Sequence, residues 1–256
     1  MSAVEVEAVV TGRVESPVVV LCNSLGSTYH IWDAQLAALA DRFRVIRYNT
    51  RGHGDSPIPS GPWVLDDLAD DLVALLDRLD VAKGHLVGLS LGGMTAMRVA
   101  ARNPERVNRM AILCSAARLP PAAGWTERAA TALNLGTVAV APAVVARWFT
   151  PAYLAANPRI RETHEAMVAA TPSCGYALCC EVIAALDLRA DLVAIKAPTL
   201  VIAGADDLAT PPAKLREIVT AVHDAQLLVV PRAAHLANAE RPDIITPALI
   251  NHLERS

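Results

Sequence analysis

The sequence is poor in aromatic residues and has no uncharged stretch as long as a membrane span. Aromatic residues make up 4% of the 256 residues, although hydrophobic residues reach 53%. No uncharged run reaches the roughly 20 residues that a membrane-spanning helix needs. The N-terminal sequence MSAVEVEAVVTGR also lacks the basic segment and apolar stretch of a secretory signal. We therefore expect the apolar residues to form a core, and the protein to be cytoplasmic and without a membrane partner.

Strong charge and metal-ligand spacing are also lacking. The 23 basic and 26 acidic residues give a net charge of −3 without a basic stripe, so no nucleic-acid partner is expected. The five cysteines are odd in number and scattered, which predicts reduced thiols and no metal site; they are Cys22, Cys114, Cys174, Cys179 and Cys180. No residue set points to a cofactor, and no segment indicates an oligomeric state. A small-molecule role is the leading class.

Short apolar, β-branched runs recur along the chain. They span residues 16–24, 43–50, 84–90, 109–115, 198–206 and 225–233. Most are continuously apolar rather than alternating, which is typical of buried parallel strands. Between them, LDDLADDLVALLDRL (65–79) places leucines at helical spacing on one face. This alternation predicts an α/β fold with a mostly parallel central sheet flanked by helices, and the weaker pattern of residues 5–15 predicts an antiparallel edge hairpin.

The alternation breaks after Ser115. Residues 119–190 are Ala-rich, helical in pattern and punctuated by prolines, and they hold five of the ten aromatic residues. We predict an α/β core in residues 1–118 and 191–256, with residues 119–190 inserted as a helical cap over an apolar pocket. Any one of these aromatic residues could instead serve only to pack the cap helices together.

A serine lies between glycines where a strand pattern changes to a helical one. Gly88-Leu89-Ser90-Leu91-Gly92 has the form G-x-S-x-G, which places a serine on a tight strand-to-helix turn. The flanking glycines remove Cβ atoms that would clash there. The turn lifts the serine Oγ to the carboxyl edge of the sheet, next to a helix N-terminus that favours a developing oxyanion. The pattern predicts that Ser90 is a nucleophile.

A serine nucleophile requires a base and an acid that orients the base. On this type of fold they follow the serine in the order acid, then histidine. Asp207 follows the strand pattern PTLVIAG, and His235 follows QLLVV, so both should reach the sheet edge of Ser90. Asp206 is a rival acid, and Asp207 is preferred because the turn after Gly204 has the form G-x-x-D.

The tetrahedral intermediate also needs hydrogen-bond donors for its oxyanion. One is expected from the residue after the nucleophile and one from the loop after the first central strand. The backbone N–H groups of Leu91 and Leu25 fit these positions. Because the donors are backbone groups, the side chains there matter little.

Several longer segments make the chain resemble the 3-oxoadipate enol-lactonases of the α/β-hydrolase superfamily. The oxyanion loop has the Asn-Ser-Leu-Gly form (23–26), where many relatives in the superfamily carry His-Gly. Residues 47–63, 114–130, 187–212 and 233–242 are similar to that family as well. One departure is Asn49, where the family pattern leads us to expect aspartate. The resemblance covers nearly the whole chain and implies an α/β-hydrolase fold.

The resemblance implies hydrolysis of 3-oxoadipate enol-lactone in aromatic-acid catabolism, with Ser90, His235 and Asp207 as the triad and no cofactor. The partner is then a small-molecule lactone that carries a carboxylate. An arginine is expected to bind that carboxylate, and Arg128 in the cap is the first choice. Trp125 and Trp148 are expected pocket walls. The alternative arginines are Arg147, Arg159, Arg161 and Arg189.

Other functions share the same nucleophile and fold. A carboxylesterase, a perhydrolase or a carbon–carbon bond hydrolase could use this triad, since selectivity depends on the cap. A ligand-binding protein on a hydrolase scaffold could retain the triad with negligible turnover. Rapid labelling by a fluorophosphonate would favour an enzyme, and turnover of the lactone but not of neutral esters would favour the enol-lactonase.

Overall fold

The computed structural model describes residues 2–255 and contains a seven-stranded sheet with the strand order β1-β3-β2-β4-β5-β6-β7. The strands are β1 (Ala8–Thr11), β2 (Val18–Cys22), β3 (Arg44–Tyr48), β4 (Gly84–Leu89), β5 (Val107–Leu113), β6 (Thr199–Gly204) and β7 (Ala225–Val230). β1 runs antiparallel to β3, and all other neighbours are parallel. The loops that follow the parallel strands therefore meet at one edge of the sheet.

The six strands predicted from apolar runs are confirmed. Each overlaps its predicted range, and β5 begins two residues before the predicted start. All six residues of β4 are buried, as a central strand covered on both faces requires. In edge strand β7, by contrast, only Val230 is buried. The continuous apolar pattern is therefore strongest at the centre of the sheet.

The predicted N-terminal hairpin is wrong, although the antiparallel edge is present. Within residues 5–15 only Ala8–Thr11 forms a strand, and it pairs with β3 rather than with the residues that follow it. Gly12 leaves the strand with φ +97°, and a Cβ there would lie 2.2 Å from the carbonyl oxygen of Phe43. Val14, which a hairpin would place on its second strand, is 71% exposed. The chain turns away after Gly12 and returns as β2.

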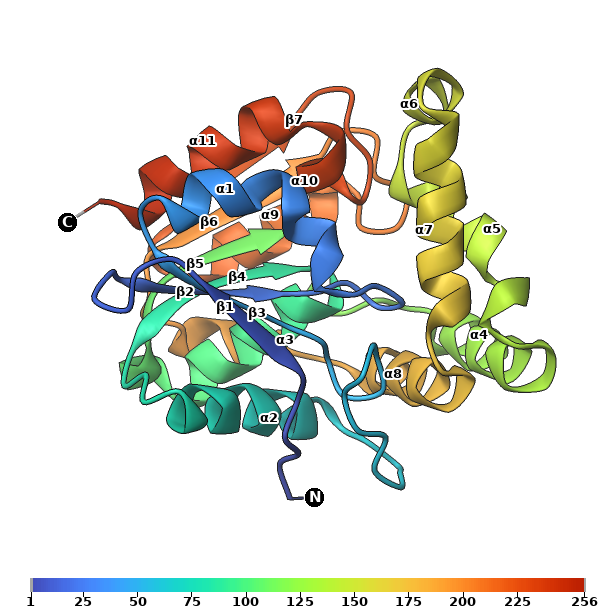
Figure 1. Cartoon of the computed structure of the whole chain (residues 1–256), viewed down its shortest axis with the longest axis horizontal. Helices are drawn as coiled ribbons and strands as arrows, with labels where there is room; N and C mark the ends of the chain where they lie inside the picture. The colour runs from blue at the N-terminus through green and yellow to red at the C-terminus, as the bar shows by residue number, and fades with distance from the viewer. Residues whose placement is uncertain (1, 256) are drawn as a thin grey trace.

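Helices cover both faces of the sheet (Figure 1). α1 and α11 lie together on one side, and α2 and α3 lie together on the other. The helices of the core are α1 (Asp33–Ala40), α2 (Leu65–Arg78), α3 (Leu91–Arg102), α9 (Pro212–Ala221), α10 (Ala237–Glu240) and α11 (Pro242–Leu253). Short 3-10 turns span Tyr29–Trp32, Pro104–Arg106, Thr137–Ala139 and Leu192–Ala194. The predicted fold class, a mostly parallel sheet flanked by helices, is confirmed.

α2 shows why the leucine pattern forms a helix. Leu68, Leu72 and Leu76 are at most 2% exposed and pack into the core, while the acidic residues begin the helix. Asp67 accepts a hydrogen bond from the backbone N–H of Val64 at 2.8 Å, which satisfies one free donor of the first turn. Burying one such leucine contributes roughly 1.5–3 kcal/mol to stability.

Five helices lie between β5 and β6, and we call them the cap helices. They are α4 (Ala122–Leu135), α5 (Ala141–Trp148), α6 (Pro151–Ala156), α7 (Pro158–Ala170) and α8 (Ser173–Ala185). Figure 1 shows them beyond the carboxyl ends of the parallel strands, with α4 beside α8 and α5 beside α7. The division into a core of residues 1–118 and 191–256 and a cap of residues 119–190 stays a prediction, because topology alone does not define which parts fold together.

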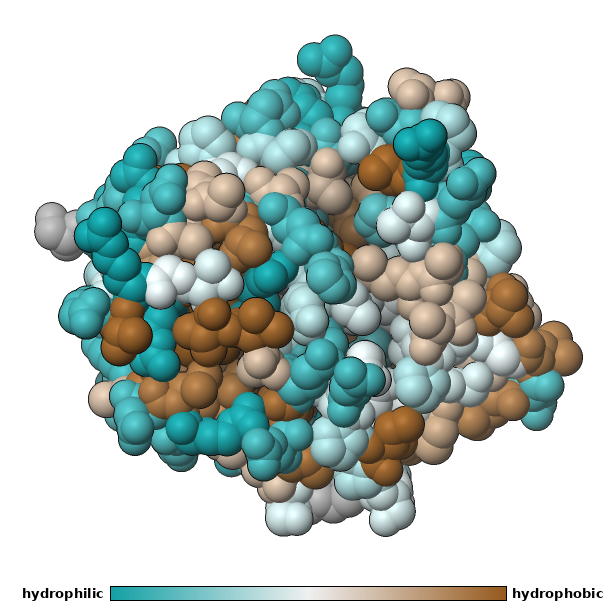
Figure 2. All heavy atoms as spheres, in the orientation of Figure 1, coloured by the Kyte–Doolittle hydropathy of each residue, from teal (hydrophilic) through white to brown (hydrophobic). Residues whose placement is uncertain are grey.

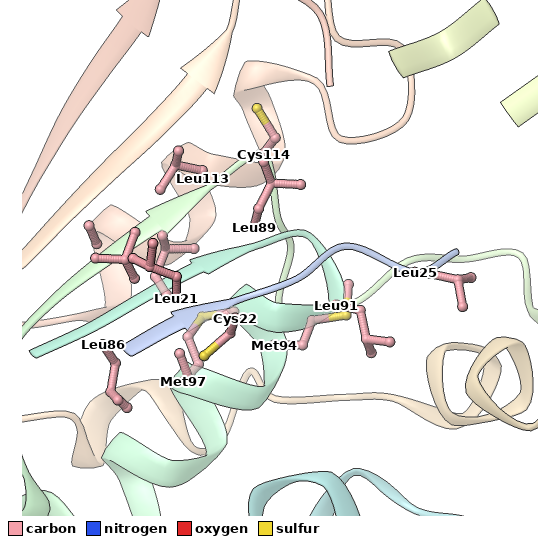
Figure 3. Close-up of a cluster of buried hydrophobic side chains, with 14 of the residues drawn as sticks. Leu21, Cys22, Leu25, Leu86, Leu89, Leu91, Met94, Met97, Leu113 and Cys114 are labelled. Atoms are coloured by element: carbon pink, nitrogen blue, oxygen red, sulfur yellow. The ribbon is translucent and has the colours of Figure 1, made fainter. Parts of the chain in front are cut away.

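Apolar residues fill the space between the layers. Figure 3 shows Leu21 and Cys22 of β2 close to Met94 and Met97 of α3, so the helix that follows Ser90 rests directly on the central strands. On the visible surface, apolar side chains gather around the end of α4 (Figure 2). Leu133, Leu135 and Val138 are more than half exposed there. No single helix within residues 2–255 is long and apolar enough to cross a membrane; α7 and α8 meet the length and composition criteria only as a pair bent by 93°.

Candidate active site

Ser90 lies on a strained turn between β4 and α3. Its backbone has φ 56° and ψ −117°, a conformation that side-chain-bearing residues rarely adopt. The surrounding chain holds it there: the Ser90 N–H donates to the carbonyl of Leu113 at 2.9 Å, and the Ser90 carbonyl accepts from the Ser115 hydroxyl at 2.7 Å. The turn presents Ser90 to a cavity of about 540 Å³.

The glycines around Ser90 are needed for space rather than for conformation. Neither Gly88 nor Gly92 has a positive φ. A Cβ on Gly88 would lie 2.3 Å from the carbonyl oxygen of Gly92, and a Cβ on Gly92 would lie 2.3 Å from that of Cys22. The elbow therefore depends on direct backbone contact between β2, β4 and α3.

We predict that Gly92→Ala destabilises the protein by about 1–3 kcal/mol, because α3 must move away from β2 to admit the methyl group. Gly124→Ala is the matched control, since no heavy atom lies within 4 Å of a Cβ at this position in α4. The control should be neutral or slightly stabilising. Urea unfolding of both variants measures the difference. Equal unfolding free energies for the two variants would contradict the close contact.

Asp207 and His235 are brought together from the loops after β6 and β7. Asp207 Oδ2 lies 2.8 Å from His235 Nδ1, and the two side chains are almost fully buried. Asp207 Oδ1 accepts the N–H groups of Ala209 at 2.8 Å and Thr210 at 3.0 Å, while the Thr210 hydroxyl donates to Oδ2 at 2.6 Å. Asp206, the rival acid, is exposed, and its N–H donates to the carbonyl of Ala233.

The environment keeps Asp207 ionised. Burial by itself would raise the pKa of this carboxyl, but the charge and hydrogen bond of His235 and the hydrogen bonds of Thr210 outweigh it and lower the pKa to about 2. With Nδ1 of His235 held by the carboxylate, Nε2 is the ring nitrogen that remains for chemistry. His235 and Ser90 line the same cavity. The arrangement can therefore pair a hydroxyl with an oriented imidazole.

Two backbone donors lie beside Ser90. Leu91 is the first residue of α3, so its N–H has no acceptor within the helix. Leu25 is on the loop after β2 and lines the cavity together with Ser24. Within residues 2–255 neither N–H donates to another group of the protein. Figure 3 shows Leu91 at the first turn of α3, with Leu25 on the neighbouring loop. Such a pair can hold an oxyanion.

The cap contributes two arginines to the cavity. Arg128 lies 5.2 Å from the ring centres of Trp125 and Tyr176, and its Nε donates to the Tyr176 hydroxyl at 2.6 Å. Arg147 lines the same cavity, and burial together with the charge of Arg128 lowers its pKa. Glu127 also lines the cavity, but within residues 2–255 neither arginine forms an ion pair with a carboxylate.

The other predicted cap residues divide into two groups. Trp125 and Trp148 both line the cavity. Arg161 pairs with Glu165 and Arg189 with Asp187, and neither lines the cavity. Arg159 also lies outside the cavity lining. Among the alternatives to Arg128, the structure thus brings only Arg147 to the cavity, within the part of the chain that it describes.

The departure at Asn49 has a structural reason. Asn49 Nδ2 donates to Glu7 Oε2 at 2.5 Å, and its Oδ1 accepts the backbone N–H of Tyr29 at 2.8 Å. An aspartate at this position would place a second carboxylate against Glu7, which also accepts the N–H of Asp55. The Asn49 amide can donate to a carboxylate with its NH₂ group and accept from a backbone N–H with its oxygen, whereas an aspartate can only accept.

Sequence reasoning missed several residues that shape the site. Thr210 supports Asp207, and Tyr176 holds Arg128, although Arg128 and Tyr176 are 48 residues apart. Glu240 accepts hydrogen bonds from both the N–H of Thr150 at 3.2 Å and the N–H of Ala234 at 2.9 Å, next to His235. The Leu236 N–H also donates to the carbonyl of Trp148 at 2.8 Å. Thr210 lies only three residues after Asp207, so it could have been found from the sequence near the acid.

Comparisons with known proteins identify the family of this chain. Residues 17–135 match the family model described as alpha/beta hydrolase fold. The chain is 36% identical to 3-oxoadipate enol-lactonase 2 of Acinetobacter baylyi, over 93% of this chain and 89% of that protein. The crystal structure of the enol-lactonase from Burkholderia xenovorans LB400 superposes with a TM-score of 0.95 at 39% identity, covering 98% of this chain and 96% of that one.

An esterase is also similar. The thermophilic esterase from Thermogutta terrifontis, solved with malate bound, has a TM-score of 0.90 at 27% identity and covers 97% of this chain and 92% of its own. The enol-lactonases are more similar in sequence than this esterase. By its fold and its identity over nearly its whole length, this chain belongs to the 3-oxoadipate enol-lactonases, a family of lactone-hydrolysing enzymes with the α/β-hydrolase fold.

Proposed function

We propose that this chain hydrolyses 3-oxoadipate enol-lactone to 3-oxoadipate in aromatic-acid catabolism. The observation that carries the proposal is a single cavity that joins Ser90 and His235 to two cap arginines, neither of which forms an ion pair with a carboxylate of residues 2–255. The substrate has a reactive lactone carbonyl and one free carboxylate. An unpaired carboxylate would be costly in a largely apolar cavity, and an arginine fork satisfies it. Membership of the enol-lactonase family supports the same substrate.

Acylation begins with Ser90. Its Oγ attacks the lactone carbonyl carbon while Nε2 of His235 takes the hydroxyl proton, and Asp207 stabilises the imidazolium. The N–H groups of Leu25 and Leu91 hold the oxyanion, a contribution of roughly 3 kcal/mol per donor in comparable sites. The ring C–O bond then breaks, and the leaving enolate oxygen takes the proton from the His235 imidazolium, which makes His235 neutral again. The resulting enol tautomerises to the ketone. The acyl chain remains on Ser90 as an ester.

Deacylation repeats these steps with water. His235 removes a proton from water, which attacks the acyl carbonyl carbon, and the second tetrahedral intermediate expels Ser90 Oγ. The proton returns to Oγ from the imidazolium. The product then carries two carboxylates. A cavity with both Arg128 and Arg147 has one cation for each of them.

The first experiment is ultraviolet-monitored hydrolysis of freshly generated 3-oxoadipate enol-lactone beside p-nitrophenyl acetate, with Ser90→Ala as the control. A strong preference for the lactone supports the proposal. A preference for the neutral ester would leave the triad standing and would overturn the substrate assignment. In that case the similarity to the Thermogutta terrifontis esterase favours a carboxylesterase as the second candidate.

We predict that Arg128→Ala lowers kcat/KM for the lactone by roughly 10- to 100-fold and affects p-nitrophenyl acetate much less. The reason is that a hydrogen bond to a charged group contributes about 1.5–3 kcal/mol, and only the lactone carries a carboxylate. Nε and Nη2 of Arg128 both donate to the Tyr176 hydroxyl, which leaves Nη1 for the ligand. Steady-state kinetics on the two substrates measure the selectivity.

Two variants control for other effects of this substitution. Arg189→Ala removes an exposed arginine outside the cavity and should leave kcat/KM unchanged for both substrates. Tyr176→Phe removes the hydroxyl that accepts from Arg128 while keeping the cation. An equal loss on the lactone and the neutral ester in Arg128→Ala would indicate a packing defect and would reject the carboxylate-binding role.

A further inference from the structure

A buried histidine outside the triad contacts the loop that carries Leu25. His53 lies on the loop after β3 and is 0% exposed. Its Nε2 accepts a hydrogen bond from the backbone N–H of Gly26 at 2.9 Å, and its Nδ1 lies 3.3 Å from the carbonyl oxygen of Arg51. His53 does not line the cavity. It therefore acts on the site only through the loop.

The two contacts define the protonation state of the ring. A backbone N–H can only donate, so Nε2 must present its lone pair to Gly26. The Arg51 carbonyl can only accept, so Nδ1 carries the hydrogen. Burial lowers the pKa of His53 to about 4, which keeps the imidazole neutral near pH 7. The ring is thus a fixed acceptor.

The loop that carries His53 is itself firmly held. The guanidinium of Arg51 makes two hydrogen bonds to the carboxylate of Asp71, at 2.6 and 2.7 Å, and both side chains are buried. Asp71 belongs to α2, so this pair anchors the loop to the core. The position of His53 relative to the sheet is therefore held by a buried ion pair of the core.

Gly26 follows directly after the expected oxyanion donor. It has φ +76°, and a Cβ there would lie 2.8 Å from the ring of Tyr176, so the loop has little freedom to relax. The Gly26 N–H is directed at His53, away from the cavity, while the N–H of the preceding peptide, at Leu25, has no acceptor in residues 2–255. Adjacent peptides share the Leu25 Cα, so fixing one restricts the other.

We propose that His53 is a positioning residue for catalysis: its Nε2 holds the Leu25–Gly26 peptide so that the Leu25 N–H stays aimed at the oxyanion. This inference rests on the proposed serine mechanism, but not on the identity of the lactone. Loss of the acceptor would leave the Gly26 N–H buried and unpaired, and the loop would turn to satisfy it. Stabilisation of the oxyanion would then fall while the cavity kept its walls.

The test compares His53→Gln with His53→Asn. A glutamine amide can place an oxygen near the position of Nε2, whereas asparagine reaches only to the position of Nδ1. We expect His53→Gln to stay within a few-fold of wild-type kcat. His53→Asn should lose roughly 10- to 100-fold in kcat on p-nitrophenyl acetate with little change in KM, because a partly lost oxyanion donor affects the transition state.

Phenylboronic acid provides a second measurement, since it forms a tetrahedral adduct on the serine that places an oxygen in the oxyanion position. Its affinity should fall in His53→Asn by a factor similar to the loss in kcat. His252→Gln is the matched control, because His252 is also buried but binds the carbonyl of Met110, remote from the cavity. The control should retain wild-type kcat and boronate affinity.

Either of two results would overturn the inference. One is a folded His53→Asn variant with unchanged kcat and boronate affinity. The other is a His53→Asn variant in which KM rises while kcat stays at the wild-type value. If His53→Asn does not fold, the same measurements of kcat and boronate affinity are made on His53→Leu, and the same losses are expected. Wild-type enzyme that hydrolyses the ester but not the lactone would reject the proposed substrate, while the His53 comparison on the ester would still decide this inference.

Discussion

Ser90→Ala is expected to reduce kcat on the lactone by at least 10⁴-fold, and by about 10⁶-fold if the serine acts as in well-studied serine hydrolases. The alanine keeps the backbone bonds of the turn, in which the Ser90 N–H donates to Leu113 and the Ser90 carbonyl accepts from Ser115. Only the hydroxyl that attacks the carbonyl is lost. Unfolding stability should therefore stay within about 0.5 kcal/mol of wild type, as urea titration would measure.

The control for this loss is another serine of the same cavity. Ser24 lines the cavity and is 3% exposed, but the mechanism assigns no role to its hydroxyl. Ser24→Ala should keep most of the activity, and only wild type and Ser24→Ala should be labelled by a fluorophosphonate. Turnover by Ser90→Ala at the wild-type rate would reject the nucleophile.

Asp207→Asn is expected to lower kcat by about 10⁴-fold. The reason lies in the groups around the carboxylate. Oδ1 accepts two backbone N–H groups, from Ala209 and Thr210, so an amide must keep its oxygen there. Its NH₂ group then takes the place of Oδ2 and faces Nδ1 of His235. Nδ1 must become the acceptor, which moves the ring proton to Nε2, where it can no longer accept from Ser90.

Asp206→Asn is the natural control, since Asp206 is exposed and its side chain has no contact with His235 among the interactions of residues 2–255. It should retain wild-type kcat. If the two substitutions were equally harmful, or if Asp206→Asn were the more damaging, the assignment of the acid would be wrong. Steady-state kinetics at one pH suffices for this comparison.

The same carboxylate contributes to stability in a defined pH range. The pKa of Asp207 is lowered from 3.8 to about 2 in the folded protein. The folded state therefore binds its proton less readily than the unfolded state, and the contribution is fully present above about pH 4. It is lost as the pH falls through about 2. Asp207→Asn should remove this part of the acid dependence.

Local patterns predicted the elements well where burial is uniform. Every β4 residue is buried, so its sequence is an unbroken run that predicts a central strand. The α2 leucines share one buried face, so their spacing predicts a helix. β1 was assigned to a hairpin because sequence patterns favour neighbouring segments. Its real partner, β3, is determined by contacts of Gly12 with residue 43 that no local pattern contains.

The candidate site shows the same limit. The positions of Asp207 and His235 follow from strand ends and could be predicted, as could Arg128 in the cap. The stacking of Arg128 on Tyr176 and the contact between His53 and Gly26 join residues 48 and 27 positions apart. They depend on how segments far apart in the sequence pack, two helices in the first case and two loops in the second, and such packing has no periodic signal in the sequence.

Glu240 has a kinetic consequence. Its carboxylate binds Thr150, directly after Trp148 and Phe149, and also Ala234, directly before His235, while the Leu236 N–H donates to Trp148. A displacement of the segment between α5 and α6 would therefore pull on the chain that carries His235. Admission of substrate by opening that side would disturb the base, whereas movement of α4 would not involve these bonds. We therefore expect ligand exchange on the α4 side to leave the hydrogen bonds around His235 intact.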